Sequence, residues 1–136
     1  MITLGVIDAR IKRQKISDQA GAQFVPREEV KSRISALRGH KDSKFLFGIF
    51  EDNDKWTALS VESLIGCYNG KLSELNLRTE ADLFHGFFGQ DGGKHKSDVL
   101  LNDGRKFWMK SVGISCSFQN IILMLQKLPQ DITLDE

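Results

Sequence analysis

The chain has 136 residues, of which 40% are hydrophobic and 27% are charged, and its net charge is +1. This length and composition are typical of one globular domain and exclude a disordered chain. The nearly balanced charge gives no reason to expect nucleic acid as a partner. The longest apolar run, 121–125, is far shorter than a membrane span, and residues 1–8 lack the basic start of a signal peptide. We therefore expect a cytoplasmic protein.

Residues 1–43 are predicted to form an N-terminal extension to the main domain. The first residues are ambiguous, because Ile2, Leu4 and Val6 alternate with small or polar residues as they would in a short strand. A locally basic stretch follows, and residues 17–21 are predicted to form a loop. The side chains of the basic stretch are Arg10, Lys12, Arg13 and Lys15.

A helix is predicted over residues 26–38. Pro26 suits the first position of a helix, where its missing N–H costs nothing. Val30, Ile34 and Leu37 follow at the spacing of a single apolar stripe. Gly39 is a natural stop.

Residues 44–111 are predicted to form six or seven strands joined by tight turns. Asn69-Gly70 is typical of a type I′ hairpin turn, because both central residues of that turn need a positive φ. Short connections of this kind favour antiparallel pairing. The last strand would place Phe107 and Met109 on one face and Trp108 on the other, whereas residues 79–96 could form a strand, a helical turn or a loop. The predicted strands are 45–50, 56–61, 64–68, 72–77, 98–101 and 106–111.

A second helix is predicted over residues 114–128, with Ser115 or Ser117 as its N-cap and Pro129 after its end. Residues 129–136 are predicted to form a flexible acidic tail. The fold class that follows is mainly β, in the α+β sense: a small antiparallel barrel or half-barrel closed by the C-terminal helix. The apolar stripe of that helix comprises Phe118, Ile121, Ile122, Leu125 and Leu128.

The order of these elements resembles that of the pleckstrin-homology-like domain, particularly its small bacterial versions. The similar pieces cover about residues 44–128 and are a strand pair at 58–65, the Asn-Gly turn, a strand at 74–77, an Asn-Asp-Gly hairpin at 102–107 and the closing helix. The small bacterial domains usually have an arginine in the first strand pair and a proline in the strand after the turn. This chain has Ser63 and Asn76 at those positions. The resemblance implies a small barrel that binds a partner, although another small barrel or an α+β sheet would fit the same order.

No motif of a known catalytic site is present, so we predict a protein that is not an enzyme and needs no cofactor. His40, His85 and His95 lack the spacing of a metal site, and no metal is predicted. Cys67 and Cys116 match no redox motif, and their apolar neighbours predict two buried thiols and not a disulfide. The enzymatic alternative is an unfamiliar site near His85, with Cys67 as a nucleophile.

The favoured function is a non-catalytic interaction module that binds a protein partner or associates with itself. Phe87 and Phe88 lie beside glycines and could project, and the last helix has a wide apolar arc. That arc could equally be covered by the N-terminal segment. The candidate partner-binding residues are Phe87, Phe88, Trp108, Leu123 and Met124.

The alternative function is binding to a membrane surface or to another anionic ligand through local basic clusters. Solvated lysines and arginines with no ligand would show the same pattern. Glu51 to Lys55, the loop in which lipid-binding relatives of the resembled family carry basic residues, is net acidic here. The candidate anion-binding residues are Arg10, Lys12, Arg13, Lys15, Lys94 and Lys96.

Overall fold

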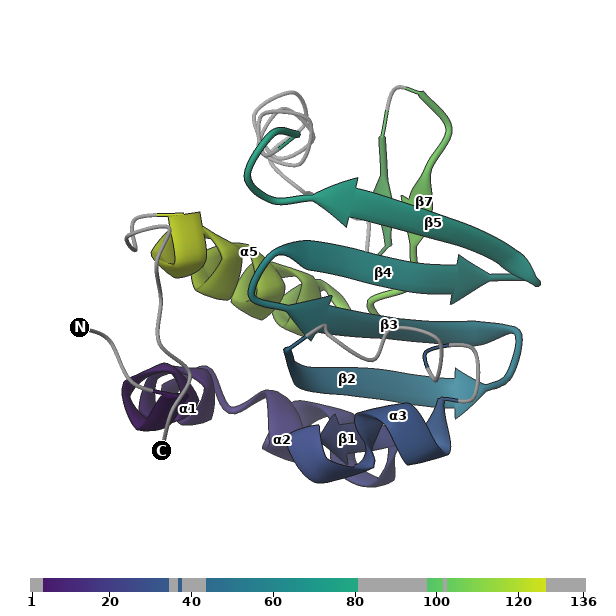
Figure 1. Cartoon of the computed structure of the whole chain (residues 1–136). Helices are drawn as coiled ribbons and strands as arrows, with labels where there is room; N and C mark the ends of the chain where they lie inside the picture. Colours follow the sequence, from purple (N-terminus) through teal and green to yellow (C-terminus); the bar gives the residue numbers. More distant parts are fainter. Residues whose placement is uncertain (1–3, 35–36, 38–43, 81–97, 102, 127–136) are drawn as a thin grey trace.

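The computed structural model describes residues 4–34, 37, 44–80, 98–101 and 103–126. They form an α+β fold built on a five-stranded antiparallel sheet in the order β1-β2-β3-β4-β5, with a separate two-stranded hairpin, β6–β7 (Figure 1). The strands are β1 (Phe24–Pro26), β2 (Phe45–Asp52), β3 (Lys55–Ser60), β4 (Ser63–Tyr68), β5 (Lys71–Asn76), β6 (Val99–Leu100) and β7 (Lys106–Phe107).

The hairpins of the sheet follow from local turn chemistry, as predicted. Asn69 and Gly70 have φ values of 52° and 83°, the positive values of a type I′ turn, and they join β4 to β5. In the turn between β2 and β3, the amide of Asp54 donates to Oδ1 of Asp52 at 2.8 Å. Ser60 organises the next turn by accepting the amide of Ser63 at 2.9 Å.

The N-terminal segment is helical, so the short strand and the loop considered for it are wrong. Helix α1 (Leu4–Arg13) is followed directly by α2 (Ile16–Ala20). Ile7 and Ile11 lie one helical turn apart and are both buried, as is Ile16. Burial of this stripe against the sheet outweighs the weak alternation of Ile2, Leu4 and Val6.

The helix predicted over residues 26–38 is much shorter in the structure. Pro26 ends β1, a 3₁₀ turn covers Arg27–Glu29, and α3 has only four residues, Val30–Arg33. Ile34 has an extended backbone with ψ of 91°, which ends the helix. The predicted stripe of Val30, Ile34 and Leu37 is nevertheless buried, because it packs on the sheet.

The C-terminal helix is confirmed as α5 (Val112–Gln126), although residues 127–136, including the predicted tail, lie outside the described part. Its N-cap is Ser111, whose Oγ accepts the amide of Ile114 at 3.2 Å. The prediction of Ser115 or Ser117 is wrong because both are buried inside the helix.

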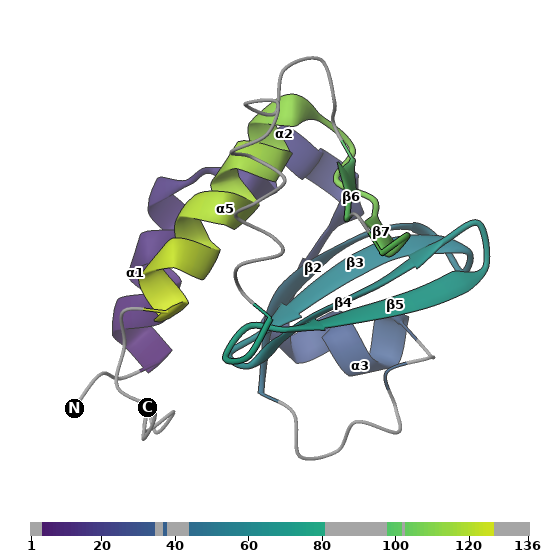
Figure 2. The same cartoon turned by 90° about the horizontal axis from the view of Figure 1, so that it is seen from above.

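Two hydrophobic cores lie on opposite faces of the sheet. The larger one joins the sheet to α1, α2, α5 and the β6–β7 hairpin, and the smaller one joins it to α3. Figure 2 shows α1 and α5 on one side of the sheet and α3 on the other. The two edge strands of this sheet, β1 and β5, do not pair, so the sheet is open. Of the predicted barrel or half-barrel, the barrel is therefore wrong, since a barrel would join its edge strands around a single interior.

Trp108 does not follow the predicted strand alternation. It is 7% exposed, and its neighbours Phe107 and Met109 are both at 0%. Strand β7 ends at Phe107, and Lys110 has a positive φ of 71°, so the backbone turns and brings all three side chains into the core.

Candidate functional site

A groove with a cavity of about 480 Å³ lies between α1 and the end of the sheet that carries the edge strand β1 and its neighbour β2. Its inner wall is apolar, since Ile11, Leu46 and Phe47 are all buried. Its outer wall carries charges of both signs from α1 and from the 3₁₀ turn after β1. The side chains that line it include Asp8, Lys12, Phe24, Arg27, Glu28 and Phe47.

An ion pair links the two sides of this groove. Nη1 of Arg27 donates to Oδ2 of Asp8 at 2.7 Å, and Nη2 of Arg27 lies 3.9 Å from Oε1 of Glu28. The side chains of Arg27 and Asp8 are 27% and 42% exposed, so water screens the pair and its contribution to stability is at most about 1 kcal/mol. Its main effect is therefore to hold two polar groups in place at the groove.

Stacked aromatic rings connect the inner wall to the main core. The rings of Phe24 and Phe47 stack with their centroids 5.9 Å apart, and Phe47 packs on Phe118 of α5 at 5.1 Å. Phe24 is only half-buried, so part of its ring faces the groove. The groove thus offers a preformed apolar surface that is anchored in the main core.

The predicted basic residues of the N-terminal segment lie on the surface. Arg10, Lys12 and Arg13 project from α1 and Lys15 follows it; all four are exposed, and none forms an ion pair with another described residue. Lys12 also lines the groove. Lys94 and Lys96 lie outside the described residues.

The five predicted partner-binding residues are not brought together by what the structure describes. Phe87 and Phe88 lie outside the described residues, and Trp108 is buried. On α5, Leu123 is 36% exposed, whereas Met124 is half-buried against the core. The N-terminal segment covers part of this helix, because Gln14 accepts from Nδ2 of Asn120 at 3.3 Å.

The residues considered for an enzymatic site offer little reactivity where they are described. Cys67 is buried as predicted, whereas Cys116 is exposed, so the prediction of a buried thiol is wrong for Cys116. Burial raises the pKa of the Cys67 thiol, which makes it a poor nucleophile at neutral pH. Its proposed partner, His85, lies outside the described residues. In the described ranges, no three His, Cys, Asp or Glu side chains gather where they could hold a metal ion.

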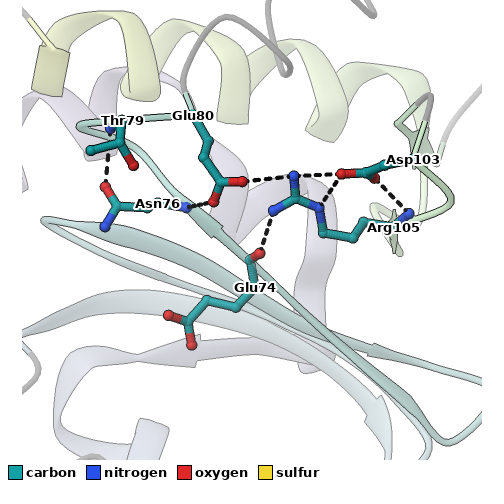
Figure 3. Close-up of polar contacts among 6 residues, drawn as sticks. All are labelled: Glu74, Asn76, Thr79, Glu80, Asp103 and Arg105. Atoms are coloured by element: carbon teal, nitrogen blue, oxygen red, sulfur yellow. Dashed lines mark hydrogen bonds and ion pairs between the residues drawn. The ribbon is translucent and has the colours of Figure 1, made fainter.

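A polar cluster around Arg105 was not predicted (Figure 3). Its guanidinium binds Oδ2 of Asp103 and Oε2 of Glu80 at 2.6 and 2.8 Å, and Nη1 donates to the carbonyl of Glu74 at 2.8 Å. Only the turn chemistry of 103–105 was visible in the sequence, because the other partners lie far away along the chain. The groove was missed for a similar reason, since α1, one of its walls, was read as a strand and a basic stretch.

No family model, curated protein or solved structure matches this chain. The described residues form a small α+β domain with an open antiparallel sheet. Of the helices in the described ranges, none combines the length and the hydropathy needed to cross a bilayer.

Proposed function

We propose that this domain is a non-catalytic interaction module whose groove beside α1 holds a short segment of a partner protein. The observation that carries the proposal is the groove itself, with its buried apolar wall of Ile11, Leu46 and Phe47 and the Asp8–Arg27 pair opposite. Its volume falls in the usual range of binding pockets, roughly 300 to 1,000 Å³. A cavity of this size would accept one or two apolar side chains.

The charges around the groove suggest which segment fits. Asp8 and Glu28 both lie against Arg27, whereas Lys12, the other cation that lines the groove, has no acidic partner among the described residues. Complementary charge would therefore favour a segment with an apolar residue followed by acidic residues. The apolar side chain would contact Phe24, and the carboxylates would lie along α1.

The relation to pleckstrin-homology-like domains is also a proposal. It is supported by the order of the meander β2–β5, the β6–β7 hairpin and α5 along the chain. A half-open form of such a fold would leave the second face of the sheet to α3. This relation is independent of the groove, whose walls come largely from residues before β2.

Selection from a phage-displayed library of linear peptides tests the groove. Ala9 is exposed on α1 and lines the cavity, so Ala9→Trp should fill the groove without disturbing the core. We expect apolar-acidic peptides to be enriched on the natural protein and to bind Ala9→Trp at least 10-fold more weakly. Val112→Trp is the matched control, because Val112 is 42% exposed on α5 and is absent from the groove lining. Equal binding to both variants, or no enrichment of such peptides, contradicts the proposal.

A second candidate function is binding to an anionic surface, favoured by the exposed cations of α1. Arg10 and Arg13 lie three residues apart and share a helix face with Val6, which is 48% exposed. Co-sedimentation with phosphatidylserine vesicles should then be lost in Arg10→Glu/Arg13→Glu and in 0.5 M salt, since screening shortens the reach of charge to a few ångströms. Vesicle binding that does not change with salt concentration, or no binding at low salt, rejects this candidate.

A further inference from the structure

The outer edge of the sheet is formed by β5. Around the two-residue turn, Tyr68 pairs with Lys71, and the register continues through Ser73 opposite Gly66 and Leu75 opposite Leu64. In an antiparallel ladder, alternate residues direct their N–H and C=O groups to the same neighbour. The backbone groups of Leu72, Glu74 and Asn76 therefore point away from β4, toward the free edge.

Side chains cover one half of this edge. Oε1 of Glu80 accepts the amide of Asn76 at 3.1 Å, and the amide of Glu80 donates to the carbonyl of Asn76 at 2.8 Å. Nη1 of Arg105 donates a hydrogen bond to the carbonyl of Glu74, and Nη2 of Arg105 lies 2.8 Å from Oε2 of Glu80 (Figure 3). Arg105 and Glu80 thus act together as a cover on the part of β5 that ends at Asn76.

None of the described residues covers the other half of the edge. Leu72 is 60% exposed, the largest fraction among the large hydrophobic residues that the structure describes. No described residue bonds the backbone of Leu72 on its outer side. An exposed edge strand with an apolar side chain is a template for pairing with another strand.

We infer that the β5 edge is a self-association surface, that its partner is β5 of a second copy of this chain, and that Arg105 and Glu80 keep it closed. With the cover in place, only Leu72 offers both of its backbone groups, which allows two intermolecular hydrogen bonds in the symmetric register centred on Ser73. Without the cover, Glu74 offers both groups as well. Antiparallel pairing centred on Ser73 then forms four.

This register also explains why a second copy fits. Pairing about Ser73 places Leu72 of one copy opposite Glu74 of the other, and Lys71 opposite Leu75, so no like charges meet directly across the interface. The stem of Glu74 lies against Leu72, and the two leucines meet diagonally across the two-fold axis. The same strand on both sides makes the interface self-complementary.

Sedimentation velocity on the full chain tests the inference. The natural protein should be monomeric, whereas Glu80→Ala/Arg105→Ala, which removes one charge of each sign, should dimerise with a Kd at least 10-fold lower. Glu51→Ala/Lys55→Ala is the matched control, because it removes another exposed ion pair, with atoms 3.5 Å apart, and uncovers no strand edge. If the double variant loses its cooperative thermal unfolding, Arg105→Ala alone is used, since it already frees the carbonyl of Glu74.

The register is tested by changing charge at Leu72, whose exposure lets it accept polar residues. In the uncovered variant, Leu72→Glu would oppose Glu74 of the second copy and should weaken dimerisation at least 10-fold. Leu72→Lys would place a positive charge opposite the same carboxylate, and this attraction should preserve or strengthen dimerisation. A folded uncovered variant that stays monomeric, a natural protein that already dimerises as strongly, or a dimer indifferent to both changes at Leu72 overturns the inference.

Discussion

Nη1 of Arg105 donates a hydrogen bond of 2.8 Å to the backbone carbonyl of Glu74, a residue 31 positions earlier in the chain. This contact ties the turn between β6 and β7 to the edge strand of the sheet. The same guanidinium binds carboxylates on both sides, from Asp103 and Glu80. One side chain therefore joins the β6–β7 turn to residues 74–80, which lie far from it in the sequence.

Acid should weaken the fold through the carboxylates that Arg105 binds. Hydrogen bonds from Arg105 hold the pKa values of Glu80 and Asp103 below their usual range. The unfolded chain has ordinary values, near 4, so their stabilisation is complete above about pH 5 and is lost as the pH falls through the folded values. In Arg105→Met, urea denaturation between pH 6 and pH 2 should show a smaller loss of stability than in the natural protein. Parallel stability curves for the two proteins would contradict this prediction.

Thr57 should contribute to the stability of the fold through its hydroxyl group and not only through the volume of its side chain. Its side chain is fully buried in β3, and Oγ1 donates to the carbonyl of Trp108 at 2.5 Å. Thr57→Val keeps the shape but leaves that buried carbonyl without its donor, which should cost about 1 to 3 kcal/mol of unfolding free energy. Thr57→Ser is the control, because it retains the hydroxyl and should cost less. Chemical denaturation measures both, and a Val variant as stable as the natural protein would argue against the bond.

Gly66 should resist replacement because of packing. A Cβ at this position would lie 3.0 Å from Cδ1 of Phe107 and 3.3 Å from the carbonyl oxygen of Trp56. Phe107 is fully buried and cannot move aside, so Gly66→Ala should cost about 1 to 3 kcal/mol. Gly113→Ala is the matched control, since the closest contact of its Cβ would be the flexible end of Gln19, at 3.1 Å, and Oγ of Ser111 would lie at an ordinary 3.9 Å. In helix α5 that change should be neutral or stabilising by up to about 1 kcal/mol, as thermal unfolding would report.

Replacement by alanine should destabilise the protein at Ser111 but not at Ser115, although both serines lie at the start of α5. Ser111→Ala removes the N-cap bond to the amide of Ile114 and should cost about 1 kcal/mol. The Oγ of Ser115 is buried and has no hydrogen-bond partner, among the described residues, to lose. Ser115→Ala should therefore leave stability unchanged or raise it slightly. Differential scanning calorimetry would show the contrast, and equal losses for both variants would mean that Ser111 is not the cap.

The two thiols should react at very different rates. Cys116 is exposed on α5, whereas Cys67 is buried in β4 and has a thiol pKa raised by burial. An aromatic disulfide reagent should therefore modify one thiol quickly and the other only as the protein unfolds. Cys116→Ser should abolish the fast phase alone. A fast phase that survives this substitution would place Cys67 at the surface.

Local sequence determined the hairpins and the helix that follows them. Asn69-Gly70 defines a turn by backbone conformation alone, and the apolar spacing of Phe118, Ile121 and Leu125 defines the buried face of α5. Val30, Ile34 and Leu37 were likewise identified as a buried stripe, even though their helix is shorter than predicted. These features depend on residues close together in the chain, so they could be predicted from the sequence alone.

Only the tertiary structure decided how those elements meet. The sheet is open, with β1 and β5 as its edges and helices on both faces, and Trp108 is buried because the backbone turns after β7. The groove beside Phe24 and the cover formed by Arg105 and Glu80 each combine segments that are distant in sequence. Such contacts depend on the packing of the whole chain, and no local pattern of residues encodes them.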